Sequence, residues 1–223
     1  MRVHVLLEAG ETPPRELDWL ADGERERLRG MRFPRRRHDF RCGRWTAKRA
    51  LARVVGIPET PERLAELEVR ADGRGAPTAW LRGEPLPHEL SLSHRAGAVF
   101  CVVGGPGSRV GCDVEWVEPR SPEFVRHMLT QAEQRWLQRL PAEAQHEAAN
   151  LIWSAKESAL KATRIGLDVD VRALGLHVQT EGDGRFWIQL PAAAELLHGC
   201  WGRHGDWVWT IASPHMFVIE PLA

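Results

Sequence analysis

Hydrophobic and polar residues follow two different periodicities along the chain. Segments with apolar residues near helical spacing predict helices, and short alternating or continuous apolar runs predict strands. The predicted helices cover residues 16–29, 37–55, 130–140 and 142–164. The predicted strands cover residues 3–7, 67–71, 90–94, 98–103, 110–117, 174–179, 186–190, 207–212 and 216–220. Gly56 and Pro58 should end the second helix.

The order of these elements favours an α+β fold with mostly antiparallel sheet, because helices are grouped between strands without regular alternation. A short sequence also occurs twice: Trp45-Thr-Ala-Lys48 and Trp153-Ser-Ala-Lys156 lie 108 residues apart, each in a predicted helix. This spacing is close to half of the 223-residue chain. We therefore predict two similar halves, residues 1–106 and 107–223, with a ligand cleft between them.

Composition excludes several protein classes. The longest apolar stretch, residues 98–104, is far shorter than the roughly 20 residues of a membrane helix. The first apolar run contains His4 and is followed at once by Glu8, which argues against a signal peptide. The four cysteines are scattered, so neither a disulfide framework nor a structural zinc site is expected. We expect a soluble, cytoplasmic protein with no membrane partner.

The net charge is zero, but residues 23–53 contain twelve Arg or Lys and only three acidic residues. Such a density attracts polyanions, either a phosphorylated cofactor or nucleic acid. The alternative is a solvated helix face in an Arg-rich chain. Only Phe33, Phe40 and Trp45 lie within the segment, so it lacks the interleaved aromatic residues of a single-strand-binding platform.

Asp113 and Glu115 give the clearest local chemical signal. They are two positions apart in a predicted strand, so their side chains share one face about 7 Å apart. Hard carboxylate oxygens at this spacing suit Mg²⁺. Two ordinary solvated acids are the alternative.

A third carboxylate comes from a predicted helix. Trp153, Glu157 and Lys161 form one stripe at helical spacing, with Lys156 beside it. A carboxylate accompanied by ammonium groups is what a magnesium–diphosphate site requires, because it supplies both a metal ligand and positive charge for the phosphates. A helix-stabilising Glu157–Lys161 pair is the alternative.

Ser93 and His94 do not form a nucleophilic pair, because neighbours in a strand face opposite sides. His94 fits better as a donor to phosphate, with an ordinary surface histidine as the alternative. Glu133 closes a capping box that begins at Thr130. The chain has no P-loop, G-x-G-x-x-G or H-E-x-x-H motif, which argues against a nucleotide kinase, a Rossmann enzyme and a zincin.

Taken in order, Ser93-His94, Gly111-Cys-Asp113-Val-Glu115 and Trp153-Ser-Ala-Lys156-Glu157, followed by Lys161, resemble the 4′-phosphopantetheinyl transferases of the larger, surfactin-synthetase-activating type. The order and the intervals agree over nearly the whole chain. The resemblance implies two similar α+β halves related by a pseudo-twofold. It also implies transfer of the phosphopantetheine arm of coenzyme A to a serine of an apo acyl or peptidyl carrier protein, with release of adenosine 3′,5′-bisphosphate.

The same resemblance assigns roles to individual residues. The implied magnesium ligands are Asp113, Glu115 and Glu157. The implied cofactor-binding residues are Arg29, Arg41, Arg74, Ser93, His94, Asp113, Lys156 and Lys161. Arg41 would contact the 3′-phosphate of coenzyme A, assisted by Arg29. Arg74 would substitute for a lysine that the family usually carries where this chain has Ala76.

The implied catalytic residues are Glu157, Lys156, His94 and Glu133. The carrier serine would attack the phosphorus that bears pantetheine, and Glu157, or Glu133 through a water, would accept its proton. The capping role of Glu133 competes with this assignment. Mg²⁺ would offset charge on the phosphoryl oxygens.

Two other classes of function remain open. A magnesium-dependent phosphohydrolase or nuclease would use the same carboxylates, and a non-enzymatic nucleic-acid-binding protein would use the basic segment. The transferase reading instead predicts coenzyme A and a carrier protein as partners and no nucleic acid. It also predicts a monomer, because one chain carries a complete set of site residues.

Overall fold

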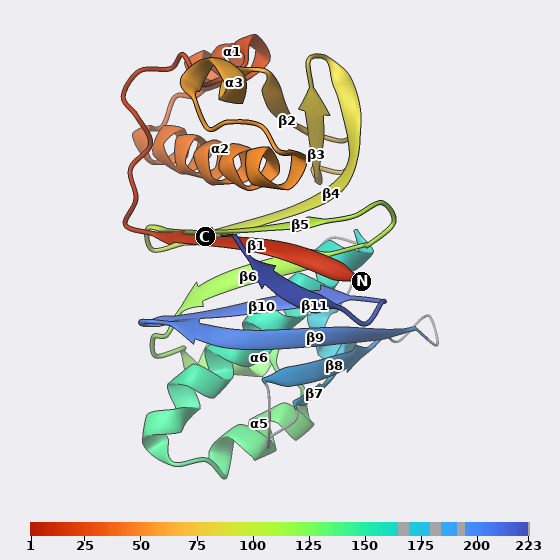
Figure 1. Cartoon of the computed structure of the whole chain (residues 1–223). Helices are drawn as coiled ribbons and strands as arrows, with labels where there is room; N and C mark the ends of the chain where they lie inside the picture. The colour runs from red at the N-terminus through yellow and green to blue at the C-terminus, as the bar shows by residue number, and fades with distance from the viewer. Residues whose placement is uncertain (165–169, 179–183, 191–194, 223) are drawn as a thin grey trace. The chain divides into compact units, whose positions relative to one another are not determined.

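The computed structural model describes residues 1–164, 170–178, 184–190 and 195–222. The chain divides into two units, which we treat separately (Figure 1). Unit 1 comprises Met1–Ser108 with Phe217–Ala223, and unit 2 comprises Arg109–Met216. The division follows Ser108 rather than residue 106. The last seven residues, which the sequence analysis assigned to the second half, belong to unit 1 because β11 (Val218–Pro221) pairs in parallel with β1 (Arg2–Ala9).

Unit 1 contains a six-stranded sheet in the order β11-β1-β5-β4-β3-β2. Four of its strands form an antiparallel meander, which runs from the edge strand β2 (Leu67–Ala71) through β3 (Pro77–Leu81) and β4 (Glu84–Arg95) to β5 (Ala98–Gly104). The last strand of the meander then pairs antiparallel with β1. Strand β3 was not predicted, because this short strand starts at a proline directly after a turn-rich loop.

The helices of unit 1 are α1 (Asp22–Gly30), α2 (Pro34–Val55) and α3 (Pro61–Ala65). Ala47 and Leu51 of α2 are completely buried in a core shared with Val103 of β5. As predicted, α2 ends at Gly56, which adopts a left-handed φ of 72°. In contrast, α1 begins six residues later than predicted. Its N-cap residue is Ala21, whose backbone N–H donates to the Glu24 Oε2 over 3.1 Å.

Unit 2 contains a five-stranded antiparallel sheet in the order β6-β10-β9-β8-β7. Its strands are β6 (Gly111–Trp116), β7 (Gly175–Val178), β8 (Arg185–Gln189), β9 (Leu196–His204) and β10 (Trp207–Ser213). Its helices are α4 (Pro122–Met128), α5 (Gln131–Gln138) and α6 (Ala142–Thr163), with a 3₁₀ turn, η2, at Val171–Ala173. Helix α4 and strand β9 were not among the predicted elements, and the last residue of the strand predicted at 174–179 lies outside the described residues.

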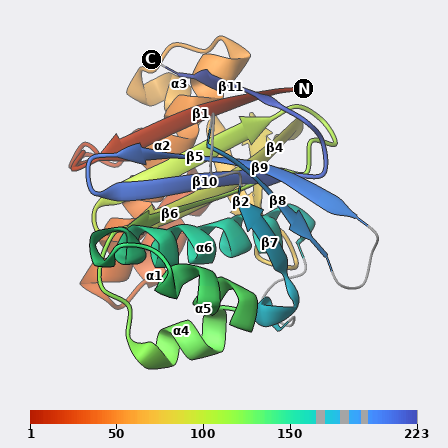
Figure 2. The same ribbon diagram turned by 90° about the horizontal axis from the view of Figure 1, so that it is seen from below.

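Helix α6 covers β6 and β10, with α5 beside it (Figure 2). Ala155 and Ala159 of α6 are completely buried against Phe186, Ile188 and Ala212 of the sheet. The small residues on α6 let the helix lie close to the strands. None of the helices that the structure describes is long and apolar enough to cross a membrane.

Both units repeat one order of elements. Each begins with a strand, continues through helices, and then forms a four-stranded meander whose last strand pairs with the first strand. Unit 1 adds β11 at the other side of its first strand. Helices α2 and α6 each have 22 residues and begin 108 positions apart, the same interval that separates Trp45 from Trp153. The predicted α+β fold with two similar halves is therefore confirmed.

Candidate functional site

The candidate site lies where α6 approaches β6 most closely. Gly111 permits this approach, because a Cβ at this position would lie 2.0 Å from the Ser158 carbonyl oxygen and 2.4 Å from the Ala162 nitrogen. Side chains alternate along a strand, so Asp113 and Glu115 share the face of Gly111 and point toward α6. The glycine thus sets the distance at which α6 can reach both carboxylates.

The predicted stripe on α6 meets these two carboxylates. The Lys161 Nζ donates a hydrogen bond to the Asp113 Oδ1 over 2.9 Å. Glu157 lies one helical turn from Lys161 toward the N-terminus of α6, and Trp153 lies one turn further. The Trp153 indole Nε1 donates to the Glu115 Oε1 over 3.0 Å. The structure therefore brings the carboxylates of β6 and the stripe of α6 together, as the sequence pattern suggested.

Negative charge is concentrated at this contact. Burial raises the pKa of Glu157, Lys161 opposes the rise, and the carboxylates of Asp113 and Glu115 add to it. Burial alone would lower the pKa of Lys161, but Asp113, Cys112 and Glu157 together outweigh burial, so the pKa is raised. Three carboxylates thus interact in one place, with Lys161 as a charged neighbour.

Arg120 is a member of this cluster that the sequence analysis missed. Its Nη2 donates to the Glu115 Oε2 over 2.7 Å, and its Nε donates to the Oδ1 of the fully buried Asn150 over 2.7 Å. Arg120 lies in an irregular segment where no periodicity indicates a partner. The alternative of two solvated acids is wrong, because Asp113 is only 4 % exposed and the Glu115 side chain only 12 % exposed.

The chemistry of the three carboxylates suits Mg²⁺, which prefers hard oxygen ligands. Their present arrangement is a set of ion pairs: Lys161 binds Asp113, and Arg120 binds Glu115. Within the described ranges, no group of three or more His, Cys, Asp or Glu side chains is arranged to hold a metal ion. The metal-ligand roles of Asp113, Glu115 and Glu157 stay predictions.

Lys156 and Glu133 form a second ion pair, inside unit 2. The Lys156 side chain is completely buried, and its Nζ lies 2.7 Å from the Glu133 Oε2 and 3.0 Å from the Met128 carbonyl oxygen. The same Oε2 accepts the Thr130 N–H over 2.7 Å, so the predicted capping box of α5 is confirmed. Burial lowers the pKa of Lys156, and Glu133 opposes this effect.

Unit 1 contains the same arrangement. Lys48 is completely buried, and its Nζ lies 2.5 Å from the Glu24 Oε2 and 2.9 Å from the Trp19 carbonyl oxygen. The Glu24 Oε2 also accepts the backbone N–H of the N-cap residue Ala21 over 3.1 Å. Trp19 precedes its helix cap by two residues, as Met128 precedes the cap at Thr130. The repeat therefore includes the pairing of each buried lysine.

Unit 2 also matches a known protein family. Residues 109–212 match the family model of the 4′-phosphopantetheinyl transferase superfamily, and this range begins at the first residue of unit 2. Residues 109–212 are a 4′-phosphopantetheinyl transferase superfamily domain. The chain is also similar to the 4′-phosphopantetheinyl transferase HetI of Nostoc sp. strain PCC 7120, with 25 % identity over 150 residues. The match covers 66 % of this chain and 61 % of the relative, which is less than two thirds of the relative's length.

Outside the transferase domain, β4 of unit 1 carries Ser93 and His94. Ser93 is buried and His94 is exposed, which agrees with the alternation of the strand. The His94 Nε2 lies 3.7 Å from the Asp39 Oδ2. An exposed imidazole can contact an external phosphate, so the predicted phosphate-binding role of His94 stays possible in this geometry.

Three arginines of unit 1 that were predicted to bind the cofactor have different surroundings. Arg29 and Arg74 are exposed. The Arg41 Nη2 donates to the Pro14 carbonyl oxygen over 2.5 Å and, at 3.4 Å, to that of Pro13. Carbonyl groups hold this guanidinium without neutralising it, so its charge is available to an anion.

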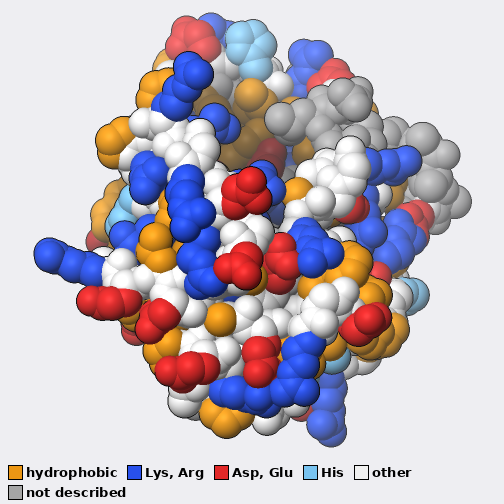
Figure 3. Space-filling view, turned by 90° about the horizontal axis from the view of Figure 1, so that it is seen from above, with side chains coloured by type: hydrophobic (Ala, Val, Ile, Leu, Met, Phe, Trp, Pro, Cys, Tyr) orange, Lys and Arg blue, Asp and Glu red, His pale blue; other side chains and the backbone are white. Residues whose placement is uncertain are grey.

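Acidic residues offset part of the basic segment at residues 23–53. Glu59 pairs with Arg49 over 2.6 Å and with Arg53 over 2.5 Å, and Arg49 also pairs with Glu8. On the face in Figure 3, Lys and Arg side chains lie among Asp and Glu side chains. The local excess of positive charge is thus smaller than the sequence count suggested.

Proposed function

We propose that this chain transfers the 4′-phosphopantetheine arm of coenzyme A to a serine of an apo acyl or peptidyl carrier protein and releases adenosine 3′,5′-bisphosphate. The observation that carries the proposal is that the family match coincides with unit 2, in which Asp113, Glu115 and Glu157 interact between β6 and α6. The position of Ser93-His94 ahead of these residues supports the larger, surfactin-synthetase-activating type.

A magnesium ion is part of the proposal. Asp113, Glu115 and Glu157 would hold it, because they supply hard oxygen donors in one place. When bound, it would supply positive charge that offsets the charge on the transferring phosphoryl group. Lys161 lies beside the same carboxylates and would direct its ammonium group to the phosphates of coenzyme A.

The carrier serine needs a base, and Glu157 suits this role better than Glu133. Glu157 lies within the carboxylate cluster of α6 and β6, where its carboxylate would accept the proton of the serine hydroxyl. One oxygen of Glu133 is already bound by Lys156 and by the Thr130 N–H. Glu133 would therefore act only through its other oxygen, by way of a water.

The remaining positive charges would bind the phosphates of coenzyme A. We assign the 3′-phosphate to Arg41 with help from Arg29, and other phosphate contacts to His94, to Arg74 and to Ser93 at the strand end. Lys156 would reach a phosphate only if its pair with Glu133 opened, because its Nζ is buried. The monomeric state and the cytoplasmic location stay predictions.

The deciding experiment combines the chain with coenzyme A, Mg²⁺ and an apo carrier protein, and follows the carrier by mass spectrometry. The expected result is a gain of one phosphopantetheine group. Asp113→Asn should abolish the gain, whereas Asp206→Asn, at an exposed turn residue, should not. Release of free phosphate or cleavage of nucleic acid without any carrier gain would instead support a hydrolase. Salt-sensitive binding of nucleic acid without turnover would support a binding protein.

A further inference from the structure

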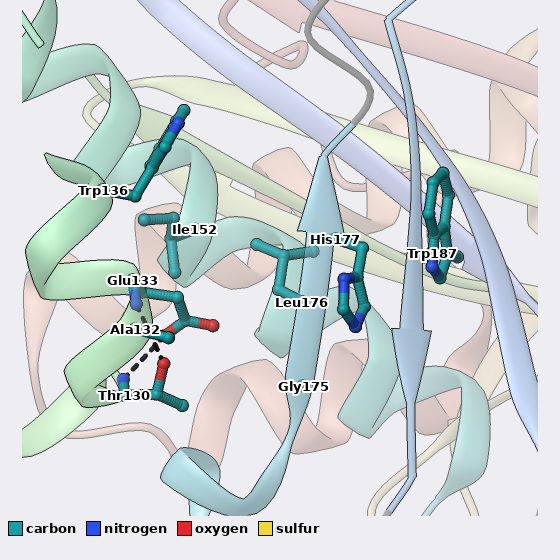
Figure 4. A pocket seen from close by; sticks show the side chains of 9 residues that line it. All are labelled: Thr130, Ala132, Glu133, Trp136, Ile152, Gly175, Leu176, His177 and Trp187. Carbon is teal, nitrogen blue, oxygen red and sulfur yellow. Dashed lines mark hydrogen bonds between the residues drawn. The ribbon is translucent and has the colours of Figure 1, made fainter. Parts of the chain in front are cut away.

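A pocket of about 400 Å³ lies in unit 2 between α5 and the first strands of the meander (Figure 4). Trp136 of α5, Ile152 of α6, Leu176 of β7 and Trp187 of β8 supply most of its apolar surface. His177 lies in the lining as well, with its ring stacked on that of Trp187 at 5.7 Å. This volume lies within the range of small-molecule pockets, roughly 300–1,000 Å³.

Glu133 brings a buried carboxylate to this pocket. Its Oε2 is bound by the Lys156 Nζ and the Thr130 N–H. Its Oε1 is shielded from water and accepts no hydrogen bond from the part of the chain that the structure describes. In Figure 4 one carboxylate oxygen is joined to Thr130 by a dashed line, and the other points toward Leu176. A buried acceptor without a donor is unfavourable by about 1–3 kcal/mol, so this oxygen needs a partner.

Unit 1 shows what the partner is in the other copy of the repeat. Glu24 has the same place as Glu133, and its Oε2 pairs with Lys48. Its Oε1 accepts the backbone N–H of Val69 over 3.0 Å and pairs with the Arg44 Nε at 3.4 Å. Val69 belongs to β2, the first strand of its meander, as β7 is in unit 2. One unit thus provides its carboxylate with a backbone amide, and the other has a pocket there.

We propose that this pocket binds a ligand with a neutral secondary amide on an apolar body. The amide N–H of the ligand would donate to the Glu133 Oε1, as the Val69 N–H donates to Glu24. Lys156 already neutralises Glu133, so a further positive charge is not required. The apolar body would pack against Trp136 and Leu176, and the donor would reach Oε1 as the side chains that shield it shift.

This proposal does not depend on the proposed transferase function. Secondary amides can come from the pantetheine arm of coenzyme A or from a separate small molecule, and the chemistry recognised is the same. The experiment therefore uses simple probes first and then distinguishes the two sources.

The first test compares three probes with the same ring: N-benzylacetamide, benzyl acetate, which lacks the N–H, and benzylammonium, which is charged. Each is titrated into the ¹⁵N-labelled full chain, and the indole Nε1–H signals are followed. The amide should shift the signals of Trp136 and Trp187 and leave those of Trp19 and Trp45 unchanged. The ester should bind about tenfold more weakly, because it cannot donate. Equal affinity for amide and ester, tighter binding of benzylammonium, or no binding of the amide would overturn the proposal.

The second test locates the site with Gly175→Val. Gly175 lines the pocket, and a Cβ there has only an ordinary 3.9 Å contact with the Gln189 Cβ, so the fold should accept the change. The variant should bind N-benzylacetamide at least about tenfold more weakly, whereas Gln189→Val on the neighbouring strand should bind it normally. Thermal unfolding checks both folds, and Trp136→Ala replaces Gly175→Val if that variant unfolds. Normal binding by the pocket variant would refute the location.

Pantetheine and adenosine 3′,5′-bisphosphate, titrated separately, then identify the source of the amide. Binding of pantetheine that is lost in Gly175→Val would assign the amide to the arm of coenzyme A. Binding of N-benzylacetamide without pantetheine would assign it to a separate small molecule. Both results support the site, and neither depends on the carrier-protein assay, so failure of the transferase proposal would remain distinguishable.

Discussion

Gly111→Ala tests whether the close approach of α6 to β6 builds the candidate site. The added methyl group would lie 2.0 Å from the Ser158 carbonyl oxygen and 2.4 Å from the Ala162 nitrogen. Both atoms belong to the backbone of α6, so no side chain can turn aside. The helix must move back by about 1.4 Å before the contact with Ser158 reaches the 3.4 Å of ordinary packing.

Two opposing effects determine how much Gly111→Ala changes the free energy of unfolding. Overpacking of a buried contact costs about 3 kcal/mol at the upper end of its usual range. Replacing glycine by alanine also restricts the unfolded chain, which offsets roughly 0.5 kcal/mol. The steric effect is larger, so the free energy of unfolding should fall by roughly 2–3 kcal/mol. For a chain of this size the Tm should drop by about 5–10 °C.

Thermal and chemical denaturation measure the stability, and the carrier-protein assay measures the activity at a temperature where the variant is folded. Activity should fall more than tenfold, because the Lys161–Asp113 and Trp153–Glu115 contacts depend on the position of α6. Gly105→Ala is the matched control, since a Cβ at that position would meet no atom within 4 Å. Normal stability and activity in Gly111→Ala would refute the argument.

Replacing Lys48 or Lys156 by Met should leave a buried carboxylate unpaired. The free energy of unfolding, measured by urea denaturation, should fall by about 3–5 kcal/mol. A loss below about 1 kcal/mol in either variant would contradict the paired geometry. Burial alone would raise the pKa of Glu59, but two arginines lower it below its ordinary 4.5, so Glu59→Gln should cost roughly 1 kcal/mol at neutral pH. The full loss of stability should be seen above pH 4.5 and should disappear as the pH falls through the folded-state pKa of Glu59. A loss that persists in acid would exclude the ion pairs as its cause. Arg41→Ala should raise the KM for coenzyme A several-fold but hardly change that for 3′-dephospho-coenzyme A, and equal effects in steady-state kinetics would show that Arg41 does not bind the 3′-phosphate.

Features that depend on neighbours in the sequence were predictable. The spacing of apolar residues located α2 and α6 to within three residues at each end, and Gly56 marked the end of α2. Strand alternation placed Asp113 and Glu115 on one face, and helical spacing placed Glu157 toward them. These predictions succeeded because periodicity is a property of a continuous segment.

Features that depend on distant residues required the tertiary structure. The last strand belongs to unit 1 because its backbone pairs with β1, and no local pattern specifies that partner. Nor does the sequence around Lys156 show that its ammonium group is buried against Glu133, or that Arg120 binds Glu115. A residue pattern states which face a side chain occupies. Folding alone decides which other segment covers that face, and therefore whether a charge meets solvent or a buried partner.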